Sequence, residues 1–232
     1  MVKTLRKLVL RGLVLATLLI LLYQAWLALH IGYWIDHNPT TTAFMESRLN
    51  EMQTQDPQAR LSQIWAPYSG ISSHLKRALI AAEDAKFLEH EGFDWEGIQV
   101  AYEKNLKKGR IVAGGSTISQ QLAKNLFLSR ERTPWRKAQE AVITLMLENI
   151  LSKRRIFEIY LNVIEWGNGV FGAEAAARHY YGVSAANISA PQAAQLAAMV
   201  TNPRYYDGHR AARGLQRKSS IILARMPSAQ VP

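Results

Sequence analysis

The feature that most restricts the fold of this chain is an unbroken apolar segment near the N-terminus. From Gly12 to Ile35 the sequence contains no Lys, Arg, Asp or Glu. An α-helix rises about 1.5 Å per residue, so these residues are enough to cross a hydrocarbon core of roughly 30 Å. We therefore predict a transmembrane anchor over residues 12–35, with a cleaved signal peptide as the alternative. The length of the run, and the lack of a small-x-small cleavage site after it, favour the anchor.

Charged residues around the anchor predict its orientation. Residues 1–11 carry a cluster of basic side chains: Lys3, Arg6, Lys7 and Arg11. An excess of Lys and Arg marks the cytoplasmic end of a membrane-spanning helix. We therefore predict a cytoplasmic tail over residues 1–11 and place everything after Asp36 on the opposite side. Aromatic residues crowd towards the outer end, as an interfacial belt would: Tyr23, Trp26, Tyr33 and Trp34.

The overall charge indicates an anionic partner. The chain of 232 residues has a formal net charge of +10 and contains no cysteine. The charge alone is compatible with phospholipid headgroups, a phosphorylated substrate or nucleic acid. The lack of cysteine excludes disulfides and thiolate metal sites. Residues 36–70 are rich in turn-forming residues and predict a connector, with one short helix around residues 44–52.

Residues 71–225 are predicted to form one mainly α-helical domain, followed by a tail over residues 226–232. Between the helices there is no sustained alternation of apolar and polar residues, so no sheet of consequence is expected. Capping residues mark three helix starts, at Ser72 or Ser73, at Asp94 and at Thr133-Pro134. Gly109 is placed to end the second of these helices. A tight glycine loop precedes an alanine-rich helix over residues 173–177.

The segment from Glu83 to Asp94 is the first with chemical character. If the preceding helix continues through it, Glu83, Phe87 and His90 share one helical face. A carboxylate with one apolar and one polar neighbour can act as a general acid or base at neutral pH. The alternative is an ordinary helix end with exposed carboxylates.

The second segment with chemical character runs from Gly114 to Asn125. Thr117 and Gln120 have capping-box spacing, which predicts a helix start behind two glycines. Such a helix N-terminus is suited to bind an anion. Thr117, Gln121 and Lys124 would lie on one face. The alternative is a capped surface helix with a flexible loop before it.

The third segment begins at Thr133 and continues as a helix through Glu148. Arg136 and Glu140 stand four residues apart, a spacing that most often means an exposed ion pair. Apolar residues surround Glu140 on this helix nearly all round, however. The pattern therefore predicts a carboxylate that borders the core.

Together these segments resemble the peptidoglycan glycosyltransferases of family 51, which occur alone or as the N-terminal domain of class A penicillin-binding proteins. The family motif EDxxFxxHxGxD matches residues 83–94, and GxSTIxQQxxKN matches residues 114–125. RKxxE matches residues 136–140, with the second Glu at Glu148, and a further block is similar to residues 155–162. The last block is weaker, because Asp207 stands where the family is expected to have a proline.

The resemblance implies a lysozyme-like, mainly α fold. It also implies a reaction that polymerises the sugars of lipid II, an undecaprenyl-pyrophosphate disaccharide-pentapeptide, into glycan strands. It implies catalytic roles for Glu83, as the general base, and for Glu140, on the pyrophosphate side. Substrate-binding roles are implied for Asp84, Phe87, His90, Gly115, Ser116, Thr117, Gln121, Lys124, Asn125, Arg136 and Lys137. It allows a divalent cation, Mg²⁺ or Mn²⁺, and no organic cofactor. A small lobe near residues 107–128 would face the membrane.

The resemblance also implies partners and a location. The implied partners are lipid II, the growing glycan strand and membrane lipids. The resemblance also allows other cell-wall synthesis or division proteins as partners, and it implies no binding of nucleic acid. The location is the bacterial inner membrane, crossed once, with the N-terminus cytoplasmic and the catalytic domain periplasmic.

Other interpretations differ in what they require. Ser73-His74-Leu75-Lys76 reads SxxK, but no SxN or KTG partner follows, so we expect a monofunctional enzyme without a transpeptidase domain. A lytic transglycosylase or lysozyme would share the fold and a catalytic Glu. It would need neither the basic side chains of Lys124 and Arg136 for a pyrophosphate nor the membrane anchor. A non-enzymatic membrane scaffold is a third reading. A nucleic-acid binder is the weakest, because the basic residues would face away from the nucleoid.

Overall fold

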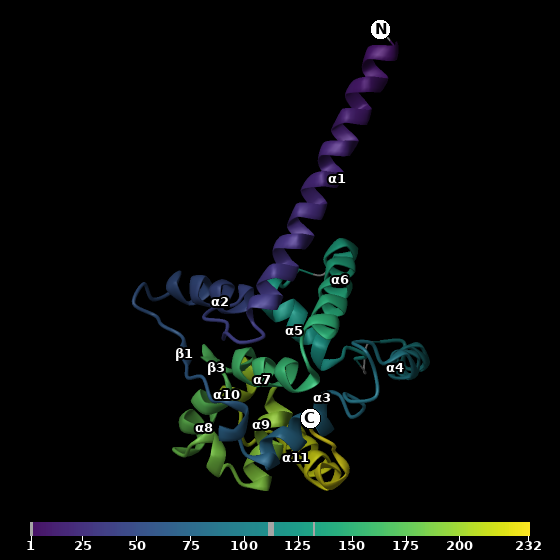
Figure 1. Cartoon of the computed structure of the whole chain (residues 1–232). Helices are drawn as coiled ribbons and strands as arrows, with labels where there is room; N and C mark the ends of the chain where they lie inside the picture. The colour runs from purple at the N-terminus through teal and green to yellow at the C-terminus, as the bar shows by residue number, and fades with distance from the viewer. Residues whose placement is uncertain (1, 111–113, 132) are drawn as a thin grey trace.

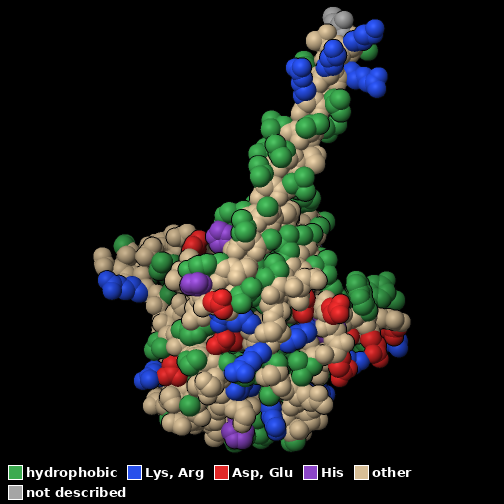
Figure 2. All heavy atoms as spheres, viewed as in Figure 1, with side chains coloured by type: hydrophobic (Ala, Val, Ile, Leu, Met, Phe, Trp, Pro, Cys, Tyr) green, Lys and Arg blue, Asp and Glu red, His purple; other side chains and the backbone are tan. Residues whose placement is uncertain are grey.

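The apolar N-terminal segment forms one long helix, α1 (Val2–Tyr33), in a computed structural model that describes residues 2–110, 114–131 and 133–232. Figure 1 shows α1 projecting from a rounded body that contains the other elements. Among the described residues, α1 alone is long and apolar enough to cross a membrane. Basic side chains gather at its far tip, and exposed apolar side chains cover its shaft (Figure 2).

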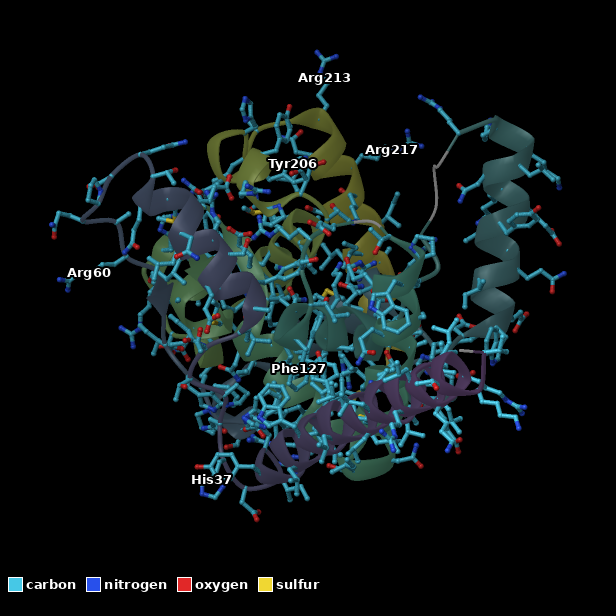
Figure 3. The ribbon with its side chains drawn as sticks, turned by 90° about the horizontal axis from the view of Figure 1, so that it is seen from above. His37, Arg60, Phe127, Tyr206, Arg213 and Arg217 are labelled. Carbon is cyan, nitrogen blue, oxygen red and sulfur yellow. The ribbon has the colours of Figure 1, made fainter. Side chains whose placement is uncertain are left out.

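The other end of α1 packs against the body. Leu27 and Ile31 are fully buried. The Phe127 ring lies 5.2 Å from the Trp34 ring and 6.5 Å from the Trp26 ring, measured between centroids. Figure 3 shows Phe127 beside α1. Helix α1 therefore continues directly into the folded body.

The connector is also folded. It contains α2 (Ala43–Gln53), β1 (Ser62–Gln63) and a 3₁₀ turn (Tyr68–Gly70), so the predicted short helix is confirmed. The Asn162 side chain bonds both the N–H and the C=O of Ala66, each at 2.9 Å. On α2, Arg48 pairs with Glu165 at 3.2 Å. These contacts hold the connector against the helices that follow it.

The remaining described chain is mainly helical, as predicted. Its helices are α3 (Ser73–Glu83), α4 (Trp95–Lys108), α5 (Ile118–Phe127), α6 (Pro134–Ile150), α7 (Lys153–Val163), α8 (Ala173–Tyr181), α9 (Ala190–Met199), α10 (Pro203–Gly208) and α11 (Arg213–Arg225). The predicted caps are confirmed at Ser72, Asp94, Thr117 and Thr133, and Gly109 ends α4 in the left-handed conformation. Helix α5 packs on α6 and α7, while α3 packs on α9 and α11.

A small sheet is present, and it is short enough to agree with the expectation of no sheet of consequence. Strand β2 (Glu165–Gly167) runs antiparallel to β3 (Val170–Phe171), and β3 pairs in parallel with β1, which gives the order β1-β3-β2. Two or three residues are too few for an alternating pattern to be visible in sequence. The glycine loop forms this hairpin, with Gly169 at a φ of 72°.

The lobe that stands apart from the body differs from the expected residues 107–128. Within that range, residues 111–113 lie outside the described residues, and α5 belongs to the core because Ile118, Leu122 and Ala123 are fully buried. It is α4 that projects from the body (Figure 1). This helix exposes large apolar side chains: Trp95, Tyr102 and Leu106.

Candidate active site

Glu83 lies at the end of α3, where the chain leaves the helix. The prediction that the helix continues to His90 was wrong, because Asp84 adopts an extended φ of −162°. Glu83, Phe87 and His90 therefore do not share a helical face. Local periodicity could not reveal this, since bonds to distant residues hold Asp84 in place.

Asp84 and Thr117 join the first two motifs. Asp84 accepts hydrogen bonds from His90 Nε2 (3.0 Å) and from the backbone N–H of Ile118 (2.9 Å). The second bond places a carboxylate at the N-terminus of α5, where the helix dipole favours it. Thr117 Oγ1 donates to the carbonyl of Gly92 (2.7 Å). Because Asp84 and Thr117 are almost fully buried, these bonds position the neighbouring residues of the cleft.

Gly92 is required by this arrangement. Its φ is 92°, a conformation that L residues rarely adopt, and an added Cβ would lie 2.7 Å from Thr144 Cγ2 on α6. The loop that follows Asp84 therefore packs directly against α6.

Glu83 is held through one oxygen only. Gln121 Nε2 donates to Glu83 Oε2 (3.0 Å), and Tyr160 Oη donates to Gln121 Oε1 (2.9 Å). Burial raises the pKa of Tyr160 well above its ordinary value, and the charges of Glu83 and Asp84 raise it further, so the phenol remains a donor. Glu83 Oε1 is buried and has no hydrogen-bond partner among the described residues.

Glu140 lies on α6 and forms ion pairs with two basic side chains of the same helix. Its carboxylate accepts from Arg136 Nη1 (2.6 Å) and from Lys137 Nζ. Glu140 is only 3% exposed, so this is a buried carboxylate, as the apolar surroundings on α6 predicted, and not the exposed pair that the spacing alone suggests. Arg136 Nε is buried without a partner among the described residues.

Lys124 on α5 is a partly buried cation near both carboxylates. In the described part of the chain its ammonium has no carboxylate within ion-pair distance, and it lies 5.6 Å from the centre of the Phe44 ring. Burial lowers the pKa of Lys124, and the charges of Arg136 and Lys137 lower it further, against the effect of Glu140 and Glu83. Such a site favours the binding of an anion.

A cavity of 390 Å³ adjoins Glu83 and is lined by residues 114–117. Within that segment Ser116 is exposed. Gly115 allows close packing on α4, because an added Cβ would lie 3.0 Å from Ile98 Cα. Lys104 of α4 and Arg225 of α11 also line the cavity.

Other predicted binding residues serve the packing of the protein. Phe87 is 1% exposed, and its ring centre lies 5.7 Å from that of Phe157. Asn125 Nδ2 donates to the Gln121 carbonyl (2.8 Å) within α5. Substrate contacts by these two residues stay predictions.

Lys218 on α11 was missed from the sequence. Its Nζ donates to Thr201 Oγ1 (3.2 Å); burial lowers its pKa, while the charge of Glu83 acts in the opposite direction. Lys218 lies outside every motif, and only the packing of α11 on α3 brings it close to Glu83. No local signal could have identified it.

Two other sequence features have structural roles. Lys76, the last residue of the SxxK sequence, is nearly buried and donates to the Tyr68 carbonyl (3.1 Å). Asp207, which stands in place of the expected proline, accepts from the backbone of Asn168 (3.0 Å) and from Tyr180 Oη (2.9 Å). Asp207 therefore ties α10 to the hairpin.

The described residues contain no group of three or more His, Asp and Glu side chains that could hold a metal. Glu140 already forms ion pairs with Arg136 and Lys137, and one oxygen of Glu83 already accepts a hydrogen bond from Gln121. These residues do not form a site for the divalent cation by themselves.

The fold and the candidate site define a class: a mainly helical protein with one apolar N-terminal helix long enough to span a membrane, and with a carboxylate, Glu83, near a group of basic side chains. A family model described as Transglycosylase matches residues 48–227. The chain belongs to this family. The sequence-based prediction of a peptidoglycan glycosyltransferase, which polymerises glycan strands in cell wall synthesis, is confirmed.

Several curated relatives are similar over nearly their whole length. A biosynthetic peptidoglycan transglycosylase of Methylobacillus flagellatus is 68% identical over 96% of this chain and 97% of its own length. A protein of the same name from Laribacter hongkongensis is 64% identical over 97% of this chain and 99% of its own length. One from a Janthinobacterium species is 59% identical over 99% of this chain and all of its own length. This coverage agrees with the expected monofunctional enzyme.

Proposed function

We propose that this enzyme elongates glycan strands from lipid II in one inverting step, with Glu83 as the general base. One observation carries the proposal. Glu83 Oε2 is fixed by Gln121, while Oε1 is a buried acceptor without a partner among the described residues. An unpaired buried acceptor is costly in the resting protein, and a substrate hydroxyl would satisfy it.

In this reaction Glu83 Oε1 takes the proton of the acceptor sugar's 4-hydroxyl as the hydroxyl oxygen attacks C1 of the donor sugar. The bond between C1 and the pyrophosphate oxygen breaks, and its electron pair leaves with the pyrophosphate. A positioned base of this kind typically contributes about 10²–10⁴-fold to the rate. Attack opposite an α-linked leaving group gives a β-1,4 linkage, and no covalent enzyme intermediate is needed.

The leaving pyrophosphate would be stabilised by the cations around Glu140. Lys124, Arg136 and Lys137 influence one another electrostatically, and Glu140 holds the last two in place. Fixed cations in a partly dehydrated site stabilise developing negative charge more effectively than water does. Glu140 would therefore act by positioning Arg136 and Lys137.

The anchor supports a location at the bacterial inner membrane. The basic cluster at the tip of α1 favours a cytoplasmic N-terminus, and the body at the other end would lie in the periplasm. Lipid II and the growing strand would be the partners in catalysis, and membrane lipids would surround α1. We also propose other cell-wall synthesis or division proteins as partners of this enzyme.

Polymerisation of fluorescent lipid II by the full chain in detergent tests this function. The wild type should form a polymer that lysozyme digests, with β linkages by NMR. Glu83→Gln should lose at least about 100-fold in rate. Glu89→Gln is a matched control, because Glu89 is an exposed carboxylate of the same segment, and it should polymerise normally. Equal rates for the two variants would refute the role of Glu83.

A further inference from the structure

A groove lies between the anchor and the start of the catalytic helix. Leu19, Ile20 and Tyr23 of α1 form one wall, and Phe127, Leu128 and Trp135 contribute to the other. The groove has a volume of 520 Å³, within the range of about 300–1,000 Å³ that is typical of small-molecule pockets. Because apolar side chains form a large part of both walls, an apolar chain can bind there.

The position of the groove suggests where that ligand comes from. Residues 19–23 lie within the apolar run of the anchor, so this wall of the groove is at the level of the membrane. An apolar chain can reach it from the bilayer without crossing water.

Two charged side chains, Arg136 and Glu131, also line the groove. Arg136 Nη1 is bonded to Glu140, whereas Arg136 Nε is buried without a partner among the described residues. A buried guanidinium N–H that lacks an acceptor is destabilising, and an anionic oxygen would satisfy it. The groove thus combines apolar walls with an unsatisfied donor for an anion.

An amide pair fixes the two walls relative to each other. Gln24 Nε2 donates to Gln139 Oε1 (3.2 Å), and Gln139 Nε2 donates to Gln24 Oε1 (3.4 Å). Both residues line the groove. Reciprocal bonds between amides hold helices together in apolar surroundings. The amide pair therefore holds α1 against α6, at the residue that directly precedes Glu140.

We propose that this groove binds the first isoprene units of the polyprenyl chain of the lipid pyrophosphate, with the pyrophosphate at Arg136. The inference rests on the proposed function, because it assigns a place to the chain of the same substrate. The ligand matches both properties of the groove, since it joins an apolar chain to an anion. The anchor would then be one wall of the substrate site.

The test compares two substitutions on α1. Ile20→Trp fills the groove, whereas Leu22→Trp adds the same side chain at an exposed position that does not line it. Binding of geranyl, farnesyl and longer polyprenyl pyrophosphates to the full chain in detergent is measured by calorimetry. Leu19→Trp, on the same wall, is a second blocking variant in case Ile20→Trp does not fold.

We expect wild-type affinity to increase with chain length. Ile20→Trp should weaken the binding of all these compounds, the geranyl one included, by about tenfold, the effect of losing roughly two buried methylene groups. Its KM for lipid II should rise while kcat stays the same. Leu22→Trp should behave like the wild type.

Two results would overturn the inference: wild-type affinity that does not depend on chain length, or equal behaviour of Ile20→Trp and Leu22→Trp. The second result would also be found if an ordinary phospholipid occupied the groove. In either case a wild type that still polymerises lipid II leaves the proposed function intact. A wild type that does not polymerise lipid II refutes the proposed function instead.

Discussion

Replacing Tyr160 by Phe removes one buried hydroxyl, and we expect this to reduce turnover. The hydroxyl donates to Gln121 Oε1 (2.9 Å), and this bond determines which end of the Gln121 amide faces Glu83. Without it the amide can turn and place its oxygen beside the carboxylate. Glu83 then loses the bond that fixes Oε2, and with it the orientation of Oε1.

The size of the effect follows from the bonds involved. A hydrogen bond to a charged group contributes about 1.5–3 kcal/mol, and about 1.4 kcal/mol corresponds to a factor of ten in rate. Tyr160→Phe should therefore lower kcat by about 10–100-fold. The buried oxygen of Gln121 that is left unpaired costs about 1–3 kcal/mol of stability, which lowers Tm by roughly 2–12 °C in a chain of this size.

The assay is the initial rate with saturating fluorescent lipid II, measured well below the Tm of each variant. Wild type, Tyr160→Phe, Gln121→Leu and the double variant are compared. If Tyr160 acts through Gln121, the double variant loses no more activity than Gln121→Leu alone. Losses that multiply, or a Tyr160→Phe enzyme as fast as the wild type, would refute this reasoning.

Three further substitutions test other parts of the site. Asp84→Ala leaves His90 and the Ile118 amide unpaired, so it should cost about 2 kcal/mol and lower Tm by about 4–8 °C in thermal unfolding. A normal Tm would contradict the role of Asp84 in joining the motifs. In the proposed mechanism Lys124 binds pyrophosphate only while protonated. Burial lowers the pKa of Lys124, so kcat/KM should fall with rising pH at a value below the ordinary lysine pKa of about 10.4. Lys124→Arg should move this fall to higher pH, and an unchanged profile would exclude Lys124 as its cause. Phe44→Leu removes the ring beside Lys124 and should raise KM about two- to fivefold at constant kcat, whereas Phe44→Tyr should not; equal KM values for the two would argue against the contact.

Local patterns predicted the helices and their ends well. The caps at Asp94, Thr117 and Thr133 were visible because a capping side chain and the helix it begins are adjacent in sequence. The conformation of Asp84 was not predictable in this way. Its partners, His90 and the Ile118 amide, become available only once α5 has packed beside the end of α3.

Residues of the candidate site that belong to motifs could be named from the sequence, whereas those that only packing brings together could not. Glu83, Gln121 and Glu140 were identified through the family resemblance. Lys218 lies on a helix without any motif, and Phe44 lies in the segment that was expected only to connect the apolar helix to the domain. Contacts between distant parts of the chain leave no periodic signal in the sequence.

The most direct test of the account is to measure binding and turnover on the same Glu83→Gln enzyme. The substitution keeps the size and shape of the side chain and removes its negative charge and its ability to take the proton. We predict that the Kd for lipid II changes by no more than about threefold, while the single-turnover rate falls by at least about 100-fold. A Glu83→Gln enzyme that turns over bound lipid II at nearly the wild-type rate would contradict the assignment of Glu83 as the base.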